Sequence, residues 1–98
     1  MARGDIVNEI ASTADSGTLV YQPASGTEVI LKTWGHHTHA SVYLYYYDGT
    51  NTSIITRGGY TENGSMISVP VNNAHYIQIH NSTGSTVSLA YGGYVTKE

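Results

Sequence analysis

The chain has 98 residues, of which 11% are charged, and its formal net charge is −3 with four Lys plus Arg. This length fits one domain, and so few basic residues exclude the positive footprint of a general nucleic-acid-binding protein. The sequence has no cysteine, which excludes disulfides and thiolate metal sites, and no apolar run approaches the ~20 residues of a membrane span. Arg3 is not followed by an apolar segment, so no signal peptide is expected.

The first 16 residues have the least regular pattern in the chain. Ile6, Val7 and Ile10 fit one turn of an amphipathic helix that Asp5 would open as its N-cap, and they fit a strand less well. A third alternative is an arm that packs on a neighbouring subunit. Residues 1–16 are therefore expected to form an N-terminal arm or short helix, and residues 17–98 a β-sandwich domain.

From Gly17 onward, short strand patterns alternate with turn signals. The expected strands cover residues 18–22, 28–34, 38–47, 52–57, 65–71, 75–80, 86–91 and 94–97. Pro23 and Pro70 suit strand ends or edges, and Asp48-Gly49 is a strong hairpin signal. This spacing predicts an all-β fold, a single antiparallel β-sandwich of seven to eight short strands that is either jelly-roll-like or immunoglobulin-like.

Period-two alternation assigns the faces of the strand over 28–34 and of the strand over 75–80. Val29, Leu31 and Thr33 are expected to face the core, and Gly35 allows a bend or bulge after them. In the later strand, Ile77 and Ile79 are expected inside. Their neighbours, Tyr76, Gln78 and His80, would then point outward.

The strand over 38–47 has a second face of an unusual kind, in a chain with nine Tyr and no Phe. Val42, Leu44 and Tyr46 form an ordinary core face. The opposite face carries Tyr43, Tyr45 and Tyr47. Three interpretations stay open for these rings: contact with another subunit, burial under another part of the chain such as the N-terminal arm, or stacking on a sugar.

Two further residues are candidates for the same surface. Trp34 has the opposite parity to Val29 and Leu31, which predicts a position at a similar boundary. His39 precedes the tyrosines on their face of the strand. Trp34, His39, Tyr43, Tyr45 and Tyr47 are therefore the candidate interface or ligand platform.

The histidines near the start of this strand are weak metal candidates. His37 and His39 project to the same face, but two imidazoles rarely complete a site. More ligands would have to come from His75 or His80, or from copies around a threefold axis. A solvent-facing loop without metal is the preferred interpretation, so neither a metal nor a cofactor is expected.

No enzyme signature stands out in the chain. There is no Gly-x-Ser-x-Gly elbow, and the acidic residues form no obvious facing pair. The glycine-rich stretches at residues 57–59 and 91–94 lack phosphate-loop spacing and are explained as β-turns or bulges. An enzyme is not expected.

Several loosely matching stretches carry a family resemblance. They are Met-Ala-Arg-Gly-Asp-Ile-Val-Asn at 1–8, Tyr-Gln-Pro-Ala-Ser-Gly-Thr-Glu-Val at 21–29, Asp-Gly-Thr-Asn-Thr-Ser at 48–53, and Asn-Ala-His-Tyr-Ile-Gln-Ile-His-Asn at 73–81 leading to Tyr-Gly-Gly-Tyr at 91–94. With them the chain resembles small virion proteins of tailed bacteriophages, which are capsid decoration proteins or small fibre or tail components. The resemblance implies a homo-oligomer, often a trimer at capsid threefold positions, with a major capsid or tail protein as partner. It implies no catalytic residues.

The expected function is therefore that of a viral structural protein, a capsid decoration or cement protein or another virion-surface component that acts by contacts between subunits. Its expected location is the virion, assembled in the host cytoplasm, with no nucleic-acid or membrane partner. The alternative is a carbohydrate-binding module on a phage fibre or tail, with a glycan as partner.

Overall fold

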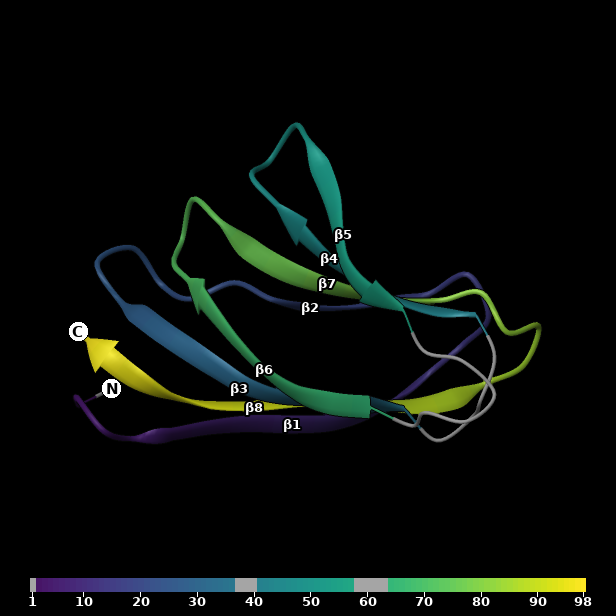
Figure 1. Ribbon diagram of the computed structural model, residues 1–98, viewed down its shortest axis with the longest axis horizontal. Coiled ribbons are helices and arrows are strands. Elements are labelled where there is room, and N and C mark those ends of the chain that lie inside the picture. Colours follow the sequence, from purple (N-terminus) through teal and green to yellow (C-terminus); the bar gives the residue numbers. More distant parts are fainter. Residues whose placement is uncertain (1, 37–40, 58–63) are drawn as a thin grey trace.

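The computed structural model describes residues 2–36, 41–57 and 64–98 (Figure 1). Its strands are β1 (Ile6–Thr13), β2 (Thr18–Tyr21), β3 (Glu28–His36), β4 (Val42–Tyr47), β5 (Thr52–Arg57), β6 (Gly64–Val71), β7 (Tyr76–Asn81) and β8 (Val87–Lys97). Among the described residues there is no helix long and apolar enough to cross a membrane.

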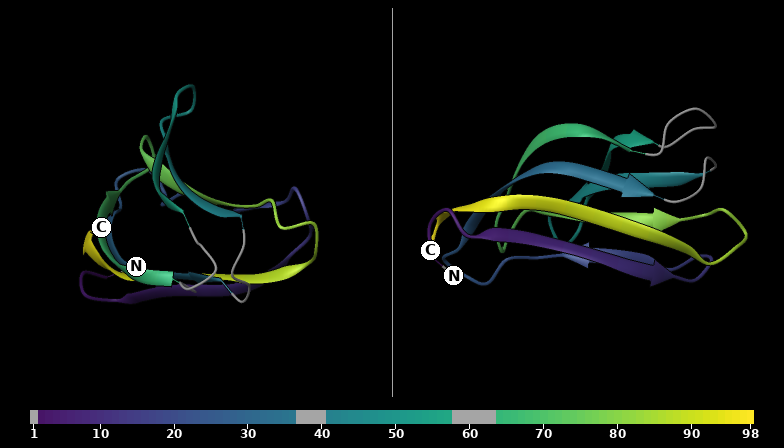
Figure 2. Two further views of the ribbon diagram at one scale, coloured as in Figure 1. Left: turned by 45° about the vertical axis from the view of Figure 1, so that its right-hand side comes forward. Right: turned by 90° about the horizontal axis from the view of Figure 1, so that it is seen from below.

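The strands form two antiparallel sheets of four, with the orders β1-β8-β3-β6 and β2-β7-β4-β5. The sheets lie as two layers, and the chain passes from one layer to the other at every connection except the β4–β5 hairpin (Figures 1 and 2). Eight strands wound in this order make a jelly roll, whereas an immunoglobulin-type sandwich divides its strands four and three. The predicted all-β sandwich is thus confirmed, and the strand order selects the jelly roll.

The core lies between the layers and is built from alternate residues of each strand. In β4, Val42 and Leu44 are buried, and in β7 Ile77 and Ile79 are buried, as the alternation predicted. Asn81 at the end of β7 is also buried. Its amide nitrogen donates to the carbonyls of Thr13 and Ser85 at 2.9 and 2.8 Å, and these bonds offset the cost of burying a polar side chain. These two bonds tie β7 to segments that adjoin the opposite sheet.

The segment expected to be an arm or short helix is strand β1. It pairs with β8 along its whole length, from Ile6 opposite Tyr94 to Thr13 opposite Val87. The predicted helical turn is therefore wrong. A short helix gains little in water, whereas β8 supplies a continuous ladder of backbone partners to this segment.

Strand β3 contains an irregularity that changes which of its side chains are buried. Its register with both β6 and β8 shifts between Leu31 and Thr33. One additional residue there reverses the alternation, so that Thr33 is exposed while Trp34 and His36 are buried. The predictions that Thr33 faces inward and that Trp34 lies at a boundary are both wrong for this reason.

The glycine pair in β8 lies beside this irregularity. The two pieces expected at residues 86–91 and 94–97 are one strand of 11 residues that runs through Gly92 and Gly93. A Cβ at Gly93 would overlap the carbonyl oxygen of Ile30 and come within 2.8 Å of the Leu31 Cα. Gly93 is therefore what lets β3 approach β8 so closely.

Candidate functional site

The outer surface of the sheet β2-β7-β4-β5 gathers most of the aromatic side chains that sequence analysis singled out. We call it the tyrosine face. Its residues share an outward parity on their strands and are Tyr43, Tyr45, Tyr47, Tyr76, Gln78 and His80, with Val20 and Ile54 toward the two edges. The outward assignments of the three β4 tyrosines and of Tyr76, Gln78 and His80 follow from the burial of their neighbours.

The β4 tyrosines interact with one another and with β7 through their rings. The rings of Tyr43 and Tyr45 stack with centroids 6.0 Å apart and an interplanar angle of 27°. Tyr47 and Tyr76 lie opposite one another, and their rings meet edge to face at 5.4 Å. The Tyr47 hydroxyl also donates to the carbonyl of Gly49 at 2.9 Å. These contacts hold the rings as an ordered, half-buried aromatic row.

Polar groups of β7 lie beside this row. Gln78 is opposite Tyr45 and His80 is opposite Tyr43 in the β4–β7 register. The Nδ1 atom of His80 lies 3.0 Å from the Thr18 hydroxyl, which fixes the imidazole against β2. The surface thus combines ring faces with hydrogen-bonding side chains, which suits either a protein subunit or a sugar.

The N-terminal segment does not cover these tyrosines. β1 is an edge strand of the opposite sheet, which lies in the other layer of the sandwich (Figure 2). The hydrophobic core lies between the two layers, so β1 and the tyrosine face are on opposite sides of it. The alternative in which the N-terminal arm buries Tyr43, Tyr45 and Tyr47 is therefore wrong. The two external interpretations, a subunit contact and a sugar platform, remain predictions.

The other candidate residues are not brought to this surface. Trp34 is only 5% exposed, and its ring lies in the core 5.4 Å from that of His36. His37 and His39 lie outside the described residues. Among the residues that are described, no three His, Asp or Glu side chains come together as a possible metal cluster.

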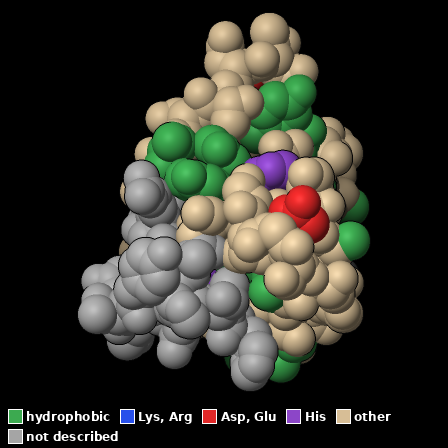
Figure 3. Space-filling model, turned by 90° about the vertical axis from the view of Figure 1, so that its right-hand side faces the viewer, with side chains coloured by type: hydrophobic (Ala, Val, Ile, Leu, Met, Phe, Trp, Pro, Cys, Tyr) green, Lys and Arg blue, Asp and Glu red, His purple; other side chains and the backbone are tan. Residues whose placement is uncertain are grey.

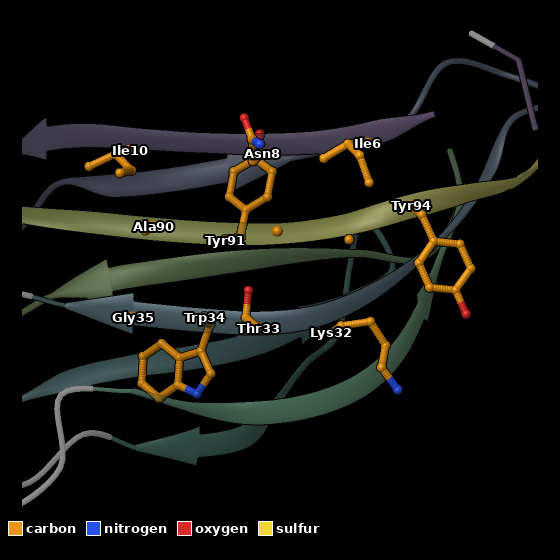
Figure 4. Close-up of a pocket in the computed structure, with 12 residues that line it drawn as sticks. Ile6, Asn8, Ile10, Lys32, Thr33, Trp34, Gly35, Ala90, Tyr91 and Tyr94 are labelled. Atoms are coloured by element: carbon orange, nitrogen blue, oxygen red, sulfur yellow. The ribbon is translucent and has the colours of Figure 1, made fainter. Parts of the chain in front are cut away.

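The opposite sheet has a hollow on its outer surface that sequence reasoning missed (Figure 4). Its volume is about 680 Å³, and it crosses β1, β8 and β3. Ile6 and Ile10 are 71% and 79% exposed along β1, while Gly92 gives the middle of the hollow no side chain. The missed signal is the strand parity of Ile6, Asn8 and Ile10, which share the face opposite Val7.

Tyr91, which is buried, and Tyr21, which is partly buried, stack against each other at the core. The Tyr91 hydroxyl donates to a carboxylate oxygen of Glu9 at 3.0 Å, and its ring stacks on that of Tyr21 at 4.9 Å. Burial, and then the neighbouring Glu9, raise the pKa of Tyr91, while burial alone raises the pKa of Tyr21. Both phenols stay protonated at neutral pH, so both rings contribute packing, and the Tyr91 hydroxyl adds its hydrogen bond to Glu9.

Figure 3 shows one end of the sandwich. In the part of this end that the structure describes, hydrophobic side chains lie in patches among uncharged surface, and charged side chains are sparse (Figure 3). This agrees with a chain in which 11% of residues are charged.

Comparison of the chain with protein-family models finds no match, and comparison with curated proteins finds no significant match.

Proposed function

We propose that this protein is a structural subunit of a virion surface, of the capsid decoration or cement type, which acts by burying its outer faces against neighbouring subunits. The observation that carries the proposal is the tyrosine face, with Tyr43, Tyr45 and Tyr47 in one row on β4, whose pairing with β7 is unbroken. Tyrosine is enriched in protein interfaces and at their energetic centres, because it buries a large ring and keeps a hydroxyl for hydrogen bonding.

The distribution of apolar surface supports the same function. Ile54 is 58% exposed beside the tyrosine face, and Ile6 and Ile10 are more exposed still on the opposite sheet. Apolar patches on two outer faces are what a subunit embedded among neighbours needs. Jelly rolls recur in viral shells, although the fold hosts other functions as well.

The proposed partners are other copies of the chain, with a trimer as one form, and a major capsid or tail protein. Assembly would take place in the host cytoplasm. Many weak contacts on a shell add up to firm attachment, because each later contact forms within an already tethered complex. No catalytic step is part of this function.

A carbohydrate-binding module on a fibre or tail is the second candidate. The observation that favours it is the stacked pair Tyr43 and Tyr45, with Gln78 and His80 beside them. Ring faces of this kind can stack on the apolar face of a sugar while the amide and imidazole bind its hydroxyls. Jelly rolls also serve as lectin domains.

The experiment that separates the two candidates measures binding to capsids and to glycans side by side. We expect the protein to co-sediment with capsids of the phage that encodes it, and the double variant Tyr43→Ser, Tyr45→Ser to bind at least about tenfold more weakly. Tyr94→Ser removes an exposed tyrosine from the opposite sheet and is the comparison variant: an equal loss of binding there would show that the effect is not specific to the tyrosine face.

Glycan-array binding that the double variant loses, without capsid binding, would favour the carbohydrate module. A protein that is a strict monomer and binds neither capsids nor glycans would contradict both candidates.

A further inference from the structure

The two open sheets end in four edge strands, β1, β6, β2 and β5. An edge strand presents unpaired backbone N–H and C=O groups, and proteins usually protect such edges with proline, short length or bulges. Pro70 interrupts β6, and β2 has four residues and is closely followed by Pro23. β5 has a register shift against β4 opposite Leu44 and Tyr45. Three of the four edges are therefore protected.

β1 carries none of these protective features. It has eight residues, its register with β8 is unbroken, and its sequence contains no Pro, Lys or Arg. Its outward side chains include the exposed Ile6 and Ile10. Its one charged residue, Glu9, accepts a hydrogen bond from the Tyr91 hydroxyl of β8. A long, regular edge whose outer face carries two isoleucines is suited to pairing with another strand.

The backbone of β1 directs its even-numbered residues toward the free edge. The amide of Val95 donates to the carbonyl of Asp5 at 2.9 Å, so Asp5 faces β8. Because consecutive residues of an antiparallel strand direct their N–H and C=O groups to opposite sides, Ile6, Asn8 and Ile10 direct theirs away from β8.

We propose that β1 pairs with β1 of a second copy of this chain, antiparallel about a twofold axis at Asn8. The pairing joins two four-stranded sheets into one sheet of eight strands. This inference deepens the proposed assembly function, on which it rests, by naming the surface through which two copies associate.

The side chains of β1 select the register. With the axis at Asn8, Ile6 of each copy lies opposite Ile10 of the other, so two apolar cross-strand pairs form on the outer face. Moving the axis to Glu9 would place two carboxylates directly opposite each other, which is unfavourable. In the register at Asn8, even-numbered residues of one copy lie opposite even-numbered residues of the other. This is required because the even-numbered residues direct their N–H and C=O groups toward the free edge.

Association also brings the outer hollows of the two copies onto one continuous sheet. Ile6, Asn8 and Ile10 line the hollow along β1 (Figure 4). In the paired sheet, the hollows of the two copies would flank a central stripe of four isoleucines. The exposed side chains of β1 thereby gain partners.

Cross-linking through a single introduced cysteine tests the axis directly, because the chain has no cysteine of its own. Opposite residues of a hydrogen-bonded antiparallel pair have Cα atoms about 5.5 Å apart, which a disulfide can bridge. We expect Asn8→Cys to form a disulfide-linked dimer under mild oxidation. Ser12→Cys, on the same edge but away from the axis, should not.

Mass measured by light scattering at several concentrations tests the association itself. We expect the unmodified protein to form a dimer. Each of the single variants Asn8→Pro and Ile10→Lys should raise the dissociation constant of that dimer at least tenfold. Proline at this position removes an N–H that points away from β8, so the circular dichroism spectrum should stay native. Ile54→Lys, on the edge strand β5 of the other sheet, is the matched control and should still dimerise.

Three outcomes would overturn the proposal. An oligomer that persists in Asn8→Pro and Ile10→Lys, with no disulfide from Asn8→Cys, would remove β1 as the interface and leave the assembly function standing through another face. A strict monomer that still binds capsids would reject self-association but keep the shell contact. A monomer whose capsid binding is lost in Asn8→Pro would assign the edge to a strand of the shell protein.

Discussion

Gly93 is the residue on which the packing of β3 against β8 depends. The irregular part of β3 lies against its backbone, where the space for a Cβ is taken by Ile30 and Leu31. Its neighbour Gly92 is less constrained, since a Cβ there would meet the Thr33 hydroxyl at 3.1 Å. The two adjacent glycines are therefore constrained differently. A side chain at Gly93 would meet backbone that cannot move aside, whereas a side chain at Gly92 would meet only the Thr33 side chain.

We predict that Gly93→Ala lowers the free energy of unfolding by about 3 kcal/mol or more, because overpacking against backbone forces the strands apart. Gly92→Ala should cost about 1 kcal/mol or less, since the Thr33 side chain can rotate away. Urea unfolding of both variants measures the difference. Equal stabilities for the two variants would contradict the close approach at Gly93.

At the scale of elements, the β4–β5 hairpin is fixed by its own turn. The carboxylate of Asp48 accepts hydrogen bonds from the backbone amides of Asn51 at 2.6 Å and Thr50 at 2.9 Å. These bonds hold the pKa of Asp48 below its ordinary value of 3.8, and the bond from the Asn51 amide has the largest effect. The turn also determines where the row of β4 tyrosines ends.

A lowered pKa in the folded state means that ionised Asp48 stabilises the hairpin at pH values above its ordinary pKa. This contribution is lost as the pH falls through the lower pKa of the folded state. We predict that Asp48→Asn lowers the melting temperature by a few degrees at neutral pH, and that the difference from the unmodified protein shrinks below about pH 4. Thermal melts recorded across this pH range measure it.

Asp48→Ala is the control for that prediction, because it removes both carboxylate oxygens and all of the hydrogen bonds they accept. It should melt below Asp48→Asn, whose amide oxygen still accepts from Thr50. A pH-independent gap between Asp48→Asn and the unmodified protein would show that the charge of Asp48 has no part in the turn.

At the scale of the whole molecule, the tyrosines that pack into the sandwich make folding sensitive to alkali. Burial raises the pKa values of Tyr21 and Tyr46, and burial together with Glu9 raises that of Tyr91. Their stabilising effect is fully present below the ordinary tyrosine pKa of about 10 and is lost as the pH rises above it, because the unfolded chain releases these protons first.

We predict that the free energy of unfolding falls steeply above about pH 10, and that Tyr91→Phe makes this fall shallower. At neutral pH, losing the hydrogen bond to Glu9 should cost about 1 kcal/mol or less. Tyr94→Phe, on the exposed side of the same strand, is the control and should leave the alkaline limb unchanged. Urea unfolding at several alkaline pH values measures all three proteins.

The amino-acid sequence by itself determined the all-β class, the β4–β5 hairpin and the faces of β4 and β7. These features depend on local signals, which are period-two alternation and the turn residues Asp48 and Gly49. The outward position of Tyr43, Tyr45 and Tyr47 followed directly from the alternation in β4.

Only the tertiary structure decided the conformation of the first residues, the burial of Trp34 and the strand order of the jelly roll. β1 is a strand because β8 offers it hydrogen bonds, and Trp34 turns inward because an additional residue after Leu31 reverses the parity of β3. That additional residue is tolerated because Gly93, distant in sequence, leaves room for it. Each of these outcomes depends on contacts between segments far apart in the chain, which no local pattern encodes.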